Sequence, residues 1–130
     1  MIAEDMKIIH IGLCAGRHPI RRNDDTPVNE CIFTSPVDAL FDFDSHRRIA
    51  SQFLQEMIQS IENDDLDRGL ATPFLSCRVH LYVTGLTPLL TAFLDMWIEY
   101  CHLEDYSPMH ELILMHYDRE SNTYKEEVWG

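Results

Sequence analysis

The chain has 130 residues, of which 45% are hydrophobic and 25% charged, and its formal net charge at pH 7 is −12. The composition excludes wholesale disorder and a fibrous repeat, and the sequence shows neither a bilayer span of roughly 18 apolar residues nor a signal peptide. We therefore predict one domain over residues 1–130, with no membrane contact and in the cytoplasm. The excess of carboxylates disfavours extended nucleic acid as a partner, whereas it permits a basic protein or a small anionic ligand held by a local cluster of donors.

The first predicted strand covers residues 7–14, an apolar and β-branched run that ends before a glycine and a proline. The loop after this strand is basic although the chain as a whole is acidic. Its cations either face a ligand at the end of the strand or pair with carboxylates of the same loop. They are Arg17, His18, Arg21 and Arg22.

A shorter strand is predicted at residues 31–34, and residues 23–27 before it have the composition of an exposed loop. The clearest periodic pattern follows and predicts a helix over 45–62 with Ser45 as its cap. The acidic segment 62–65 is expected to end this helix. The apolar stripe of the helix comprises Ile49, Ala50, Phe53, Leu54, Met57, Ile58 and Ile61.

Residues 77–83 alternate between apolar and polar side chains, which predicts a strand with one covered face. A second helix is predicted near residues 88–103, with Thr87 as its cap and Pro88 in its first position. Its apolar face is wide enough for the helix to be largely buried. That face consists of Leu89, Leu90, Phe93, Leu94, Trp97, Ile98 and Cys101.

Residues 111–117 contain an unbroken apolar run, typical of a strand that is covered on both faces in a parallel sheet. A turn at 119–122 leads into a charged edge strand over 123–129. The element order contains two strand–helix–strand units, whose right-handed crossovers make the strands parallel. The sequence therefore predicts a small Rossmann-like α/β domain: a mainly parallel sheet in which 77–83 and 111–117 are neighbours, two crossover helices and a C-terminal β-hairpin.

The junction at residues 83–88 is the most informative segment for function. A strand that turns through a glycine into a helix presents unpaired backbone N–H groups and a positive dipole end, to which two threonine hydroxyls can add donors for a phosphate or carboxylate. The same residue types are also ordinary turn and capping residues. Since ligands collect at the carboxyl ends of parallel strands, the basic loop should meet this junction. The predicted ligand-binding residues are Arg17, His18, Thr84, Gly85, Thr87 and Asp118.

The four cysteines and seven histidines lack the spacing of a metal site. Cys77 and His80 fall on opposite faces of one strand, and Cys101 and His102 point in different directions from one helix. We therefore predict no metal ion, no cofactor and cysteines that pack as reduced thiols. Cys14 could serve as a nucleophile beside a histidine, but nothing in the sequence indicates a lowered thiol pKa.

The segment from Arg78 to Arg119 carries a strand, Thr-Gly-Leu-Thr-Pro opening a helix, and a strand ending in His-Tyr-Asp-Arg. In so short a chain it resembles the small Rossmann-like proteins of prokaryotic and phage defence systems, among them the CRISPR-associated proteins that bind or degrade cyclic oligoadenylate messengers. No catalytic residue of one such family can be matched here. The resemblance implies a phosphate-containing nucleotide as ligand and a dimer with the ligand at the strand ends. Val128 and Trp129 on the edge strand also favour a homodimer, because large apolar groups near a terminus often cover a partner subunit.

Three hypotheses for function follow. The first is a small nucleotide-binding protein, a sensor or a sequestering module in phage–host defence. The second is an enzyme on the same scaffold that cleaves such a nucleotide, with His18 or His116 as acid and base. The third is an inhibitor whose acidic surface docks on a basic protein without a small ligand.

Overall fold

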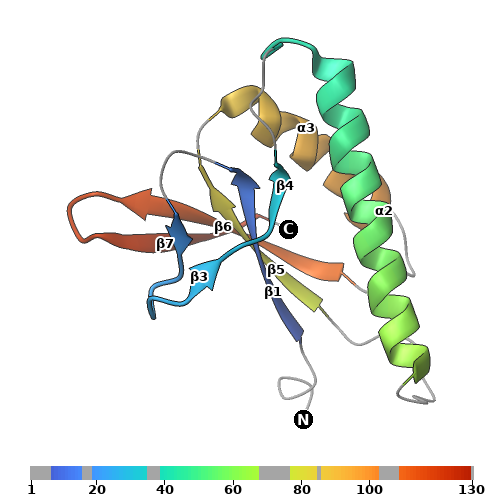
Figure 1. Cartoon of the computed structure of the whole chain (residues 1–130), viewed down its shortest axis with the longest axis horizontal. Coiled ribbons are helices and arrows are strands. Elements are labelled where there is room, and N and C mark those ends of the chain that lie inside the picture. The colour runs from blue at the N-terminus through green and yellow to red at the C-terminus, as the bar shows by residue number, and fades with distance from the viewer. Residues whose placement is uncertain are drawn as a thin grey trace.

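The computed structural model describes residues 7–15, 19–34, 39–67, 77–84, 86–102 and 109–129. Its main sheet has the order β4-β1-β5-β6-β7, in which the first four strands are parallel and β7 is antiparallel to β6 (Figure 1). This confirms the predicted small Rossmann-like α/β fold, including the pairing of residues 77–83 with 111–117. The strands are β1 (Lys7–Cys14), β4 (Cys31–Phe33), β5 (Cys77–Val83), β6 (Met109–Asp118) and β7 (Thr123–Val128).

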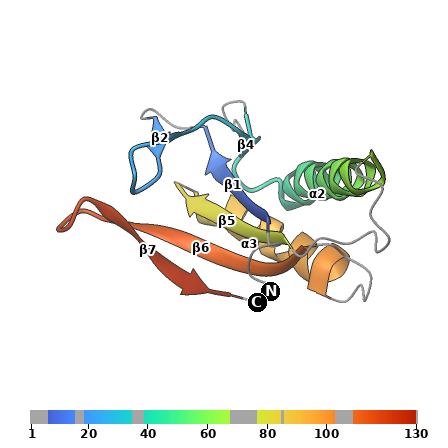
Figure 2. The same ribbon diagram turned by 90° about the horizontal axis from the view of Figure 1, so that it is seen from below.

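Both helices pack on the same face of this sheet. They are α2 (Phe43–Asp67) and α3 (Thr87–Trp97), and α3 continues into the π-helical turn η1 (Ile98–His102). The connections from β4 to β5 and from β5 to β6 run in the same direction across the sheet, so right-handed crossovers put both helices on one side. The helices lie side by side (Figure 2), joined where the Arg47 guanidinium lies 3.2 Å from the Asp95 carboxylate.

The main core lies between the helices and the sheet. Trp97 and Phe93 of α3 and Leu54 of α2 are its large buried side chains from the helical layer. The sheet side is supplied by alternate residues of β1, β5 and β6, as expected for side chains that share one face, and by Ile32 and Phe33 of β4. The residues from β1, β5 and β6 are Ile11, Leu13, Cys77, Val79, Leu81, Leu112 and Leu114. Within the described residues, no helix is long and apolar enough to cross a membrane.

The opposite face of the sheet is partly covered by residues 19–30, which we call the arm. Here β2 (Ile20–Arg21) and β3 (Pro27–Val28) form a two-stranded antiparallel sheet around a tight turn. The connection from β1 to β4 runs across the sheet in the opposite direction to the helical crossovers, so a right-handed path places it on the opposite face. The prediction of an exposed loop at 23–27 holds for the turn and misses the flanking strands, which are too short to show a periodic pattern.

The arm explains why the prediction of a half-covered β5 was wrong. His80 and Tyr82 were expected to face water, but they are only 9% and 1% exposed. Ile20 and Val28 of the arm form a second apolar cluster with Tyr82 and with Ile113 and Met115 of β6. The apolar run of β6 is buried on both faces as predicted.

The predicted ends of the first helix were also wrong. Asp42 is its cap, because an oxygen of the Asp42 carboxylate accepts the Ser45 backbone N–H at 3.2 Å, and Ser45 itself already lies within the helix. The acidic segment 62–65 is helical up to Asp67, since carboxylates lower helix stability only slightly and do not break the backbone pattern. Ile49 of the predicted apolar stripe is 41% exposed.

The C-terminal hairpin has its turn at 119–122 and its edge strand as predicted. Trp129 is partly buried: it packs against the main core, and its backbone N–H donates to the Leu112 carbonyl at 2.9 Å. This removes Trp129 from the argument for a dimer, while Val128 is 68% exposed. Homodimerisation stays a prediction.

Candidate functional site

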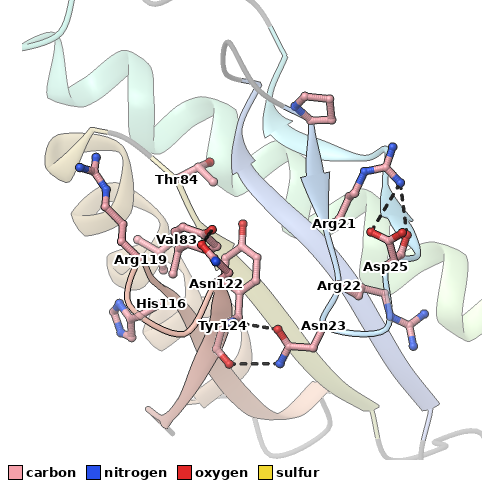
Figure 3. A pocket seen from close by; sticks show the side chains of 12 residues that line it. Arg21, Arg22, Asn23, Asp25, Val83, Thr84, His116, Arg119, Asn122 and Tyr124 are labelled. Atoms are coloured by element: carbon pink, nitrogen blue, oxygen red, sulfur yellow. Dashed lines mark hydrogen bonds and ion pairs between the residues drawn. The ribbon is translucent and has the colours of Figure 1, made fainter.

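An open cleft of about 920 Å³ lies at the carboxyl ends of β5 and β6, between the arm and the β6–β7 hairpin (Figure 3). Its position agrees with the general rule that parallel sheets bind ligands beyond the carboxyl ends of their strands. We call it the arginine cleft, after three of its lining side chains. The cleft is lined by Pro19, Arg21, Arg22, Asn23, Asp25, Val83, Thr84, His116, Tyr117, Arg119, Asn122 and Tyr124.

Three guanidinium groups reach this cleft from two sides. Figure 3 shows Arg21 and Arg22 on the arm side and Arg119 on the hairpin side. Arg21 lies 4.0 Å from the Asp25 carboxylate, and Arg22 lies 3.2 Å from Asp24. These pairs are the ones that the loop-pairing alternative predicted, but they are largely exposed and therefore weak enough to exchange for a ligand. Among the residues that the structure describes, Arg119 forms no ion pair.

The floor of the cleft includes the end of β5, which Thr84 ties to the end of β1. The Thr84 hydroxyl donates to the Cys14 carbonyl at 3.0 Å and accepts the Cys14 N–H at 3.4 Å. Its proton is therefore already used within the protein. Thr84 lines the cleft, and its hydroxyl also holds two strand ends together; its role as a ligand-binding residue stays a prediction.

The other predicted residues of the junction are placed differently. Thr87 is the first residue of α3, so Leu86 occupies the cap position, without a side-chain hydrogen bond, and the prediction that Thr87 caps the helix was wrong. Thr87 is exposed and does not line the cleft. Gly85 lies outside the described residues, as do Arg17 and His18.

Asp118 shapes the hairpin turn beside the cleft. Its carboxylate accepts the Ser121 hydroxyl at 2.9 Å and the Glu120 backbone N–H at 3.0 Å. These hydrogen bonds, that of Ser121 first, lower the pKa of Asp118 below its usual value. The carboxylate therefore stays charged and holds the turn that presents Arg119 to the cleft.

Tyrosine rings line the hairpin side of the cleft. The ring centroids of Tyr117 and Tyr124 are 5.3 Å apart, and Tyr124 also packs edge-on against Tyr82 at 4.8 Å. Tyr117 is 50% exposed, and its hydroxyl donates to the Asn122 side chain at 3.1 Å. Burial raises the pKa of Tyr124, so its phenol stays neutral at physiological pH.

Asn23 fastens the arm to the hairpin across the cleft. Its side-chain amide donates to the Tyr124 carbonyl at 3.1 Å, and its side-chain oxygen accepts the Tyr124 N–H at 2.8 Å (Figure 3). The asparagine thus pairs with β7 as a neighbouring strand would. Sequence reasoning missed Asn23, because a contact across 101 positions leaves no local pattern. It also missed Tyr117 and Tyr124, which the predicted hairpin places opposite each other.

A histidine pair lies on the face of the sheet that the arm partly covers. His10 on β1 and His80 on β5 are in register, with ring centroids 5.0 Å apart, and His10 Nδ1 lies 3.0 Å from the Tyr82 hydroxyl. Burial, followed by the nearby charges of Arg22 and His80, lowers the pKa of His10 to about 4, against a smaller opposing effect of Asp24.

His80 is equally unsuited to carry a charge. Burial lowers its pKa, and its Nε2 atom has no hydrogen-bond partner within the described part of the chain. The histidine pair is therefore neutral at physiological pH. No group of three or more potential metal ligands occurs in the described ranges.

On the outer rim, His116 of β6 lies 2.8 Å from the Glu127 carboxylate of β7. His116 lines the hairpin side of the cleft and was one of the two acid–base candidates. Comparisons of the chain with protein-family models, with curated proteins and with solved structures each find no match. The functional argument therefore rests on the residues of the cleft itself.

Proposed function

We propose that the protein binds a small phosphate-containing nucleotide in the arginine cleft, as a sensor or sequestering module in phage–host defence. The observation that carries this proposal is the local reversal of charge. The chain as a whole has a net charge of −12, yet Arg21, Arg22 and Arg119 line one cleft, and Asp25 is the one carboxylate among the described residues that line it. Guanidinium groups bind phosphate oxygens through paired, charge-assisted hydrogen bonds.

The remaining lining residues fit the rest of a nucleotide. The half-exposed ring of Tyr117, braced by Tyr124, offers a surface on which a base can stack. Asn122 and His116 add polar groups that can fix the orientation of a sugar or base. The volume of about 920 Å³ lies within the range of about 300–1,000 Å³ that is usual for small-ligand sites.

Isothermal titration calorimetry with ATP, cyclic AMP, linear triadenylate and cyclic tetra-adenylate tests the proposal. At least one of these nucleotides should bind, and Arg119→Ala should weaken that binding by roughly tenfold or more, since a hydrogen bond to a charged group contributes about 1.5–3 kcal/mol. Arg48→Ala is the matched control, because Arg48 is exposed on α2 and outside the cleft. If Arg119→Ala and Arg48→Ala bind the nucleotide equally well, the binding site lies outside the arginine cleft.

Chromatography of the nucleotide recovered after each titration separates binding from cleavage. We expect it to be recovered intact. Cleavage would favour the enzyme hypothesis, with the His116–Glu127 pair as the first group to substitute, whereas the absence of any binding would favour a protein partner.

A further inference from the structure

Among the described residues, no strand pairs with the amino-terminal half of β1 on the side of β4, so this edge is open there. On that side β4 pairs with β1 only at Gly12 and Cys14, so the lower part of β1 extends beyond it (Figure 1). The Gly12 N–H donates to the Glu30 carbonyl at 2.9 Å, and backbone groups of every second residue point the same way. Ile8 and His10 therefore direct their N–H and C=O groups toward this edge, where no described residue pairs with them.

A groove of about 410 Å³ runs beside this open edge. One wall is β1, through Ile8 and Ile9, and the other is α2. Phe53 and Met57 of α2 are half-buried and pack against the main core, so the groove has an apolar floor. We call this the edge groove; it is lined by Ile8, Ile9, Glu30, Phe53, Glu56, Met57, Ser60 and Ile61.

The charged side chains that line the edge groove in the described part of the chain are both acidic. They are Glu30 and Glu56, which are exposed at its rim. Neither carboxylate forms an ion pair within the described residues; Glu56 accepts only the side-chain amide of Gln52, at 3.2 Å. Charge complementarity therefore selects a basic occupant.

We propose that the edge groove binds an extended segment of a basic partner protein, which adds to β1 as a further strand. Backbone groups of the segment pair with Ile8 and His10, as in other cases of strand addition. Side chains of an added strand alternate between its two faces, so apolar residues face Phe53 and Met57. The intervening lysines or arginines extend to the rim carboxylates. This site is separate from the arginine cleft and does not depend on the proposed nucleotide.

A synthetic peptide with alternating Lys and Val or Ile residues, seven residues long and labelled with fluorescein, is a suitable probe for fluorescence anisotropy. We expect saturable binding. The same peptide with alternate backbone nitrogens methylated, or with Glu in place of every Lys, should bind at least about tenfold more weakly. Equal binding of the methylated peptide, or no binding of the parent peptide, would overturn the proposal.

Two pairs of protein variants locate the contact. Ile8→Pro removes the N–H that faces the open edge, whereas Ile8→Ala removes only the side chain, so Ile8→Pro alone should abolish binding. Glu56→Lys should weaken binding by about fivefold, while Glu120→Lys on the distant hairpin turn should leave it unchanged.

Circular dichroism will show whether Ile8→Pro folds. If it does not, the methylated peptide and the two glutamate variants still test whether a strand adds to the edge groove. Self-association of the unliganded protein that Ile8→Pro abolishes would instead identify a second copy as the occupant.

Discussion

The histidine pair of His10 and His80 makes the stability of the protein depend on pH. The pKa of His10 is about 4 in the folded protein, against 6.5 for an unperturbed histidine. Between these values the unfolded chain binds more protons than the native protein, so the free energy of unfolding must fall as the pH is lowered. The contribution of a neutral His10 is complete above pH 6.5 and is lost as the pH falls toward 4.

The size of this effect follows from the difference in pKa. A difference of about 2.5 units corresponds to a ceiling of about 3 kcal/mol. His10 is only partly buried, so solvent screening reduces the expected contribution to about 1–2 kcal/mol. Burial lowers the pKa of His80 too, which acts in the same direction.

His10→Gln isolates the effect, because glutamine can still hydrogen-bond to the Tyr82 hydroxyl but does not titrate. Urea denaturation of both proteins at pH 7 and pH 4.5 gives the loss of unfolding free energy for each. We expect this loss to be about 1–2 kcal/mol smaller in the variant, since carboxylate titrations are common to both proteins. An equal loss in the two proteins would refute the account of His10 as a partly buried group that desolvation and the charge of Arg22 keep neutral.

Three further substitutions test single contacts. Asn23→Ala should lower the free energy of unfolding by about 1–2 kcal/mol and speed hydrogen exchange at the Tyr124 amide, because both hydrogen bonds to that backbone are lost. Unchanged exchange would contradict the attachment of the arm to the hairpin. Thr84→Val should lower the free energy of unfolding, measured by urea denaturation, by about 1 kcal/mol, because the hydrogen bond to the Cys14 carbonyl is lost, whereas Thr84→Ser keeps it. Equal stability of the two variants would contradict this role of the hydroxyl. Asp42→Ala should lower the free energy of unfolding by about 1 kcal/mol in the same assay, and Asp42→Asn should lower it far less, because asparagine can still cap the helix. Equal stability of Asp42→Ala and the parent protein would show that the cap makes no contribution.

The order and type of the long elements could be predicted from the sequence because their patterns are local. The helical stripe from Ala50 to Ile61 and the apolar run of β6 record which face is buried, and the crossover rule then fixes parallel pairing. The arm could not be predicted in this way. Its strands have two residues each, and Ile20 and Val28 are buried only because a distant part of the sheet lies beneath them.

The candidate site was predicted in position and only partly in composition. Parallel topology directs a ligand to the carboxyl ends of the strands, and Thr84 and two arginines of the basic loop line the cleft there. Asn23 and Tyr124 meet across the cleft through a tertiary contact, which a single sequence does not record. Thr87 and Asp118 were expected to bind the ligand on the basis of short motifs, which are equally common at helix starts and in turns. In this fold Thr87 is the first residue of α3, and Asp118 holds the hairpin turn.

The measurement that tests the central claim most directly is a nuclear magnetic resonance titration of the ¹⁵N-labelled protein with the same four adenine nucleotides. The account predicts that the largest amide shifts occur at Arg21, Arg22, Thr84 and Arg119, with little change along the edge groove. No shift with any of the four nucleotides, or shifts centred away from the carboxyl ends of β5 and β6, would contradict it.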